Sequence, residues 1–181
     1  MLLTISGPST IGKDSTWLNV AKRLGMEQVV PYTTREKRDN ETDGISHRFI
    51  SVSEFQQKIK NNELLEWDYI LGNYYGTDLK YRSLIESGSP LVVDILARMA
   101  IRLKNKVSNV KTVLLLTSDS HTLQERLIKR GYEGVELIQR TSHGFEEEAH
   151  SALFDMVIPD ADIVTETQAL KVISQLIYSS E

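Results

Sequence analysis

The 181-residue sequence contains no cysteine. Disulfide frameworks, thiolate metal sites and cysteine nucleophiles are therefore excluded. The chain also has no apolar run close to the roughly 20 residues that cross a bilayer. Its N-terminal segment, MLLTISGPST, lacks the basic residues that open a secretory signal. We therefore expect a cytoplasmic protein with no membrane partner.

Positive charge is also scarce. The sequence has 21 Lys and Arg residues against 25 Asp and Glu residues, a net charge of −4, which argues against a nucleic-acid partner. Hydrophobic residues make up 40% and charged residues 25%, which is ordinary for a soluble globular protein. The length fits one domain. We therefore expect a single folded domain.

The order of apolar segments indicates the fold class. Short apolar runs predict strands at 2–6, 64–67, 69–71, 91–95, 113–116 and 156–158. Helical spacing and cap residues predict six helices. The first runs from about 13 to Gly25, the second begins at a Ser53–Gln56 capping box, and the third spans 78–87. The fourth ends at Gly131, the fifth spans 135–153, and the last begins at a Thr165–Gln168 capping box. Because strands alternate with helices, we expect an α/β fold with a mainly parallel sheet flanked by helices. The stretch 32–80 breaks the alternation and predicts a small inserted lobe.

A phosphate-binding loop is the strongest motif. The segment GPSTIGK follows a predicted strand and opens a predicted helix. In this setting glycines let the backbone wrap around phosphates, and helix N–H groups supply positive potential. A lysine at the end of the loop reaches the β- and γ-phosphates. The residues expected to bind ATP phosphates are Gly7, Ser9, Thr10, Ile11, Gly12, Lys13, Asp14 and Ser15.

The motif offers two candidates for the metal ligand. Asp14 stands where a Ser or Thr usually ligates Mg²⁺. A carboxylate suits Mg²⁺, but without a metal its charge would repel the phosphates. Ser15, one residue later, is the other candidate. We therefore predict that Asp14 or Ser15 holds the metal.

The lobe carries a second group of binding side chains. Arg35 and Arg38 are three residues apart, which would allow two guanidinium groups to clamp one phosphate. Tyr75 could add a hydroxyl donor. The Glu66 carboxylate could accept a pair of N–H donors from the edge of a base, and Thr77 could read a carbonyl or a ring nitrogen.

Together these residues resemble the guanylate kinase family. The similarity runs from Ser6 to about Asp160 and is densest at 7–13, 33–49 and 60–77, where the segment KNNELLEWDYILGNYYGT is too specific to arise by chance. The resemblance implies a P-loop kinase core (1–31 and 81–181), a GMP-binding lobe (about 32–80) and an arginine-bearing lid (about 126–148). It also implies that MgATP gives its γ-phosphate to GMP.

The same resemblance implies roles for single residues in acceptor binding. Arg35, Arg38 and Tyr75 match contacts of the GMP phosphate, and His47 stands where the family has a tyrosine with this role. Glu66 and Thr77 match the guanine readers.

The resemblance also implies a catalytic set. Asp94 matches an aspartate near the metal and the substrate. Arg126, Arg130 and Arg140 match lid arginines, which with Lys13 would neutralise charge on the transferring phosphoryl group. Asp160 lies near the position of an adenine-contacting asparagine.

Departures from the family pattern keep alternatives open. Besides Asp14 and His47, Pro31 replaces a serine, Leu96 replaces a second aspartate, and the lid is one residue short. The segment GKDS resembles the phosphate loop of ribose 1,5-bisphosphate phosphokinases. A kinase of a phosphorylated sugar is therefore an alternative to a GMP kinase, and a non-catalytic binding module is a second. Either a monomer or a homodimer is compatible with the sequence.

Overall fold

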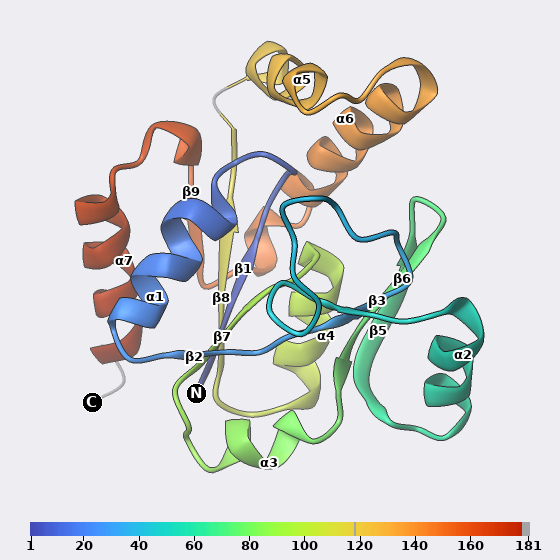
Figure 1. The fold of residues 1–181 in the computed structure, drawn as a ribbon. Helices are drawn as coiled ribbons and strands as arrows, with labels where there is room; N and C mark the ends of the chain where they lie inside the picture. Colours follow the sequence, from blue (N-terminus) through green and yellow to red (C-terminus); the bar gives the residue numbers. More distant parts are fainter. Residues whose placement is uncertain (118, 179–181) are drawn as a thin grey trace.

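The computed structural model describes residues 1–117 and 119–178, apart from the side chains of Asp14, Ser120, Glu147 and Asp162. Within that part of the chain, two sheets lie beside each other (Figure 1). The larger sheet is parallel and runs in the order β2 (Glu27–Gln28), β7 (Leu91–Asp94), β1 (Leu2–Ser6), β8 (Val110–Leu115) and β9 (Met156–Ile158). The expected α/β class is confirmed. No helix among the described residues is long and apolar enough to span a membrane.

Helices cover both faces of the larger sheet. All five residues of β1 are buried, as expected for a central parallel strand. Leu3 and Ile5 pack in one core cluster with α1 (Asn19–Arg23) and α7 (Glu166–Tyr178), whereas Leu2 packs in a second cluster with α3 (Tyr81–Glu86) and α4 (Ala97–Lys106). Figure 1 shows α1 and α7 together on one side of the sheet and α3 and α4 on the other.

The smaller sheet comes from the stretch where strand–helix alternation breaks. Its order is β4 (Arg48–Phe49), β3 (Tyr32–Thr33), β6 (Asn73–Asp78) and β5 (Leu64–Ile70), and α2 (Val52–Lys60) packs against it, with the Phe55 ring stacked on Tyr74 of β6 (Figure 1). β6 pairs antiparallel with both β3 and β5, and β3 pairs parallel with β4. Helix α4 contacts β1 and β8 of one sheet and β5 of the other, so it joins the two sheets.

Helices α5 (Ser120–Lys129) and α6 (Gly134–Glu148) pack on each other and project from one end of the molecule (Figure 1). Helix α6 lies against the loop after β1. A Cβ added at Gly144 would lie 3.3 Å from Pro8 Cβ and 2.8 Å from Leu123 Cδ2. A larger residue at Gly144 would therefore push the projecting helices away from this loop.

Several expected boundaries are wrong. The capping box of α2 is Ser51–Glu54, because Ser51 is the extended residue whose side chain accepts from Glu54 N, at 3.2 Å. The first helix begins as a π-helix over η1 (Lys13–Leu18) and becomes α1 only at Asn19. Helix α4, strand β6 and the two-residue strands β2, β3 and β4 are absent from the expectation, and the strands expected at 64–67 and 69–71 form the single strand β5. The Thr165–Gln168 capping box and strand β9 are confirmed.

Candidate functional site

The loop between β1 and η1 wraps tightly because of two glycines. Gly7 has φ +145°, and a Cβ there would lie only 2.5 Å from the Leu115 carbonyl oxygen. Gly12 has φ +88°, in the left-handed region that favours glycine, and its carbonyl accepts from Thr16 N at 3.0 Å. The loop is therefore held against the end of β8 while its backbone turns into a helix.

Lys13 lies inside this loop. Its Nζ donates to the carbonyl oxygens of Gly7, at 2.6 Å, and Pro8, at 2.9 Å. The same nitrogen is 3.9 Å from Asp94 Oδ1, at the end of the neighbouring strand β7. Because β1 and β7 are parallel, their carboxyl ends bring the ammonium group and the carboxylate to one edge of the sheet.

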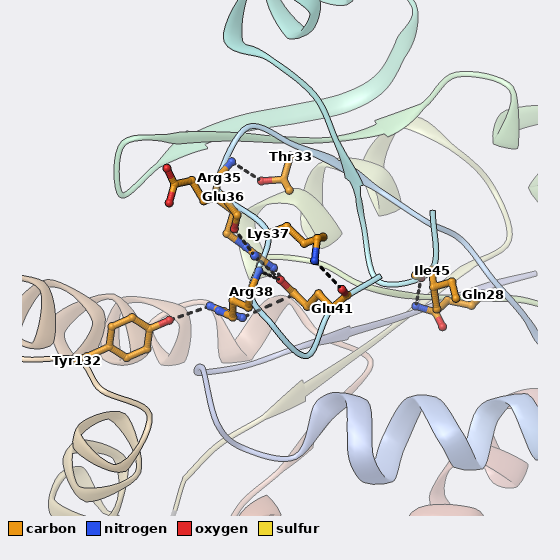
Figure 2. A network of polar contacts seen from close by, with 9 residues as sticks. All are labelled: Gln28, Thr33, Arg35, Glu36, Lys37, Arg38, Glu41, Ile45 and Tyr132. Atoms are coloured by element: carbon orange, nitrogen blue, oxygen red, sulfur yellow. Dashed lines mark hydrogen bonds and ion pairs between the residues drawn. The ribbon is translucent and has the colours of Figure 1, made fainter. Parts of the chain in front are cut away.

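An ion-pair network occupies the loop after β3. The Arg35 guanidinium donates to both carboxylate oxygens of Glu41, at 2.6 and 2.5 Å, and the Arg38 backbone N–H donates to Glu41 Oε2 at 2.9 Å (Figure 2). Burial alone would raise the pKa of Glu41, but these hydrogen bonds outweigh it and hold the pKa at about 2. Glu41 is therefore a carboxylate at neutral pH, and it fixes the direction of both arginines.

His47 lies beside these arginines. Its ring contacts Phe49 and Tyr75, with centroid distances of 5.9 and 6.4 Å. Burial, and then the charge of Arg35, lower the pKa of His47 to about 4. Its buried Nδ1 has no hydrogen-bond partner within the described part of the chain. The imidazole is thus neutral at pH 7.

Glu66 and Thr77 face each other across β5 and β6. Glu66 is 1% exposed, and Thr77 Oγ1 donates to Glu66 Oε1 at 3.1 Å. Oε2 has no hydrogen-bond partner among residues 1–117 and 119–178, although Arg102 Nη2 of α4 is 3.8 Å away. Burial raises the pKa of Glu66 to about 8. A buried carboxyl oxygen without a partner is costly, and a ligand with N–H donors would relieve that cost.

The projecting helices bring two further arginines. Arg140 of α6 donates through Nε and Nη2 to Glu136 Oε1, at 3.0 and 2.9 Å, and its Cζ lies 4.1 Å from the centroid of the Tyr132 ring. Arg130, at the C-terminal end of α5, lies on the same side of the molecule.

One cavity of about 400 Å³ joins these groups. Its size lies within the range of small-molecule sites. It brings together residues from the loop after β1, the smaller sheet, the end of β7 and the projecting helices. The sequence-predicted residues that line it are Gly7, Ser9, Thr10, Gly12, Lys13, Ser15, Arg35, Arg38, His47, Tyr75, Asp94, Arg130 and Arg140. The concentration of arginine and lysine favours ligands with several negative charges.

Other predicted residues lie elsewhere. Ile11 is buried in the core cluster beside α1 and α7, so it supports the loop from behind. Glu66 and Thr77 are buried between β5 and β6, and neither lines the cavity. Arg126 of α5 does not line it either. The prediction for Asp14 as a metal ligand concerns a side chain outside those that the structure describes.

Sequence reasoning missed three polar residues of this region. Glu41 follows Arg38 by three residues, and an acidic residue at this distance after two arginines could have predicted an ion pair. Tyr132 and Arg102 gave no signal, because their partners are distant in sequence. Arg102 Nη2 donates to Trp67 O and Asp68 Oδ2, at 2.9 and 3.0 Å.

Known proteins are similar to this chain in sequence and in fold. The family model of guanylate kinase matches residues 1–176. The chain is 31% identical over 164 residues to the guanylate kinase of Fusobacterium nucleatum, covering 90% of this chain and 89% of the relative. It is 34% identical over 173 residues to that of Gloeobacter violaceus, covering 94% and 84%. The crystal structure of guanylate kinase from Anaplasma phagocytophilum superposes with a TM-score of 0.76 at 21% identity, covering 99% of this chain and 85% of that one.

Proposed function

The chain belongs to the guanylate kinase family, and we propose that the residues around its central cavity transfer the γ-phosphate of MgATP to the phosphate of GMP. The γ-phosphorus separates from its bridging oxygen to ADP as it bonds to a phosphate oxygen of GMP, and the products are ADP and GDP. Such a transfer needs no covalent enzyme intermediate, so catalysis consists of positioning and charge neutralisation.

The loop between β1 and η1 fits the ATP phosphates. The positive φ of Gly12 and the close approach of Gly7 to Leu115 support a tightly wrapped backbone that presents N–H groups. Lys13 Nζ donates to the carbonyls of Gly7 and Pro8 in this structure. It would exchange these partners for the β- and γ-phosphates when ATP binds. A tighter contact between phosphate and ammonium would replace two neutral acceptors.

The cavity also fits Mg²⁺. This ion keeps several waters and uses few protein oxygens, so the Ser15 hydroxyl and the Asp94 carboxylate at the cavity edge, with Asp14 beside Ser15 in sequence, supply enough donors. When bound, Mg²⁺ neutralises charge on the β- and γ-phosphates.

The acceptor would be held at two ends. Arg35, Arg38 and Tyr75 line the cavity and are suited to the GMP phosphate, with His47 Nδ1 as a further partner. Glu66 Oε2 and the Thr77 hydroxyl, which are buried outside the cavity lining in this structure, are suited to the N–H donors and the carbonyl of guanine. The lid (about 126–148) would add Arg130 and Arg140, which would neutralise charge on the transferring group and exclude water.

One observation carries this proposal: Lys13 of the phosphate loop lines the same cavity as Arg35 and Arg38 of the loop after β3 and Tyr75 of β6. A donor and an acceptor phosphate could therefore meet between them. This juxtaposition of two anion sites is what a phosphotransferase needs, and a module that binds only a peptide has no use for it.

The test is ADP release with MgATP and a panel of acceptors at equal concentration: GMP, dGMP, AMP, UMP, ribose 1,5-bisphosphate and no acceptor. We expect turnover with GMP and dGMP, with AMP, UMP and buffer near the background rate. Turnover with the sugar bisphosphate but not with GMP would instead support the sugar kinase alternative. Absence of MgATP binding in calorimetry would overturn the kinase and support a binding module.

A further inference from the structure

Tyr132 lies between the two groups of arginines. It follows the C-terminal end of α5, and its hydroxyl accepts from Arg38 Nη2 at 2.9 Å (Figure 2). The face of its ring lies against Arg140, whose Cζ is 4.1 Å from the ring centroid. One side chain thus contacts an arginine of the acceptor side with its polar end and an arginine of the lid with its apolar body.

The backbone fixes where this ring can lie. Gly131 has φ +90° and donates its N–H to Ile128 O at 2.8 Å, and Tyr132 N donates to Leu127 O at 3.1 Å. This pair of hydrogen bonds is a Schellman motif, which ends α5 at a defined residue. The position of Tyr132 is therefore set by the end of a helix and does not depend on a free loop.

Among the described residues, each arginine side chain has one other charged partner, so the contact with Tyr132 completes its orientation. Arg140 is held at its edge by Glu136, and the Tyr132 ring covers its face. The guanidinium of Arg38 has Glu41 Oε1 at 3.8 Å on one side and the Tyr132 hydroxyl on the other. A guanidinium stacked on an aromatic face loses less freedom when it meets a phosphate.

We propose that Tyr132 is a positioning residue of the transfer reaction, which aligns Arg38 through its hydroxyl and Arg140 through its ring. This inference rests on the proposed function, because the two arginines matter through the phosphates that they would contact. It implies that the two contacts serve different steps. The hydroxyl aligns an arginine that holds the acceptor, and the ring aligns an arginine that meets the transferring phosphoryl group.

Two substitutions separate these contacts. Y132F removes the hydroxyl and keeps the ring, so we expect mainly the KM for GMP to change. It should rise about fivefold, which corresponds to the loss of one hydrogen bond. Y132L removes both, so we expect the same rise in KM together with a fall in kcat of about tenfold, the size of a partly desolvated cation–π contact. Y132W restores a ring without a hydroxyl and should recover most of the lost kcat.

The matched control is Tyr178, which is 69% exposed at the end of α7 and contacts neither arginine. Y178F and Y178L should keep the wild-type KM and kcat, and thermal melts should show that all variants fold. If Y132L does not fold, Y132F still decides the role of the hydroxyl, and Y132M replaces Y132L as the variant that lacks the ring. If the wild type turns over GMP and both Y132F and Y132L keep its KM and kcat, the role of Tyr132 is overturned but the proposed function stands. No wild-type turnover of GMP would overturn the proposed function and this inference with it.

Discussion

Glu41 accepts two hydrogen bonds from the Arg35 guanidinium, and the two side chains are only 11% and 10% exposed. A carboxylate thus occupies one edge of an arginine that faces the acceptor side of the cavity. The arrangement fixes Arg35 before any phosphate arrives. It also makes Glu41 a stability element inside a binding site, because breaking a buried pair leaves the remaining charge without a partner.

We expect E41Q to lower the free energy of unfolding at pH 7 by about 2 kcal/mol, the size of a charged hydrogen bond. The pKa of Glu41 is lowered from 4.5 to about 2, so its contribution is present above pH 4.5 and is lost as the pH falls toward 2. Urea unfolding at pH 7 and pH 3 should show the gap between wild type and variant closing in acid. The matched control is E166Q, which breaks the exposed Glu166–Arg23 pair and should cost less than about 1 kcal/mol. An equal cost for both variants would contradict the argument.

Lys13 should be indispensable for turnover but not for folding. We expect K13A to lose nearly all ADP release, because no other described side chain lies within the phosphate loop with a charge to meet the β- and γ-phosphates. Circular dichroism and a thermal melt should show a folded variant. A folded K13A enzyme with wild-type turnover would refute the assigned role.

The pH dependence of GMP use should follow Glu66. Burial raises its pKa to about 8, and only the ionised carboxylate can accept two N–H groups from guanine. The ionised fraction increases with pH, so kcat/KM for GMP should increase between pH 6.5 and pH 8.5, while KM for MgATP should stay nearly constant. E66Q should lower kcat/KM and remove this dependence. A profile that E66Q leaves unchanged would show that another group titrates.

Arg102 should influence GMP binding through Glu66. Its Nη2 lies 3.8 Å from Glu66 Oε2, and its charge lowers the pKa that burial raises. We expect R102M to raise KM for GMP several-fold at pH 7 and to move the pH profile toward higher pH. The control is R98M, because Arg98 also pairs with Asp68, at 3.3 Å, but no ion pair joins it to Glu66 in the described structure. Equal pH profiles in the two variants would indicate that Arg102 acts only through Asp68.

Much of the fold follows from local patterns. A continuous apolar run predicted β1, helical spacing before Gly25 predicted the first helix, and the Thr165 cap predicted the start of α7. Strands β2, β3 and β4 have two residues each, too few to show a period, and they exist because neighbouring strands supply their hydrogen bonds. The Ser51 cap was missed because two serines two residues apart both carry a suitable partner three residues on.

The contiguous loop motif predicted Gly7, Ser9, Thr10, Gly12 and Lys13 as cavity residues, whereas Ile11 of the same loop is buried in the core. The scattered residues that were predicted with the help of the family resemblance also line the cavity: Arg35, Arg38, His47, Tyr75, Asp94, Arg130 and Arg140. The hydrogen bond between Arg38 and Tyr132 joins residues 94 positions apart, and no local pattern encodes it. Glu66 is buried opposite Thr77 and does not line the cavity, and this pairing depends on strand register, which no local pattern encodes.

Helix α4 packs against β1 and β8 of the parallel sheet and against β5 of the smaller one. The phosphate loop follows β1, and Glu66 belongs to β5, so one helix packs beneath both the phosphate loop and the buried Glu66–Thr77 pair. The spacing between the donor and acceptor pockets is therefore built into the framework before either nucleotide arrives. Only the lid (about 126–148) is then free to adjust, while the distance between the two pockets stays constant. An inhibitor that bridges both pockets would therefore have one optimal length.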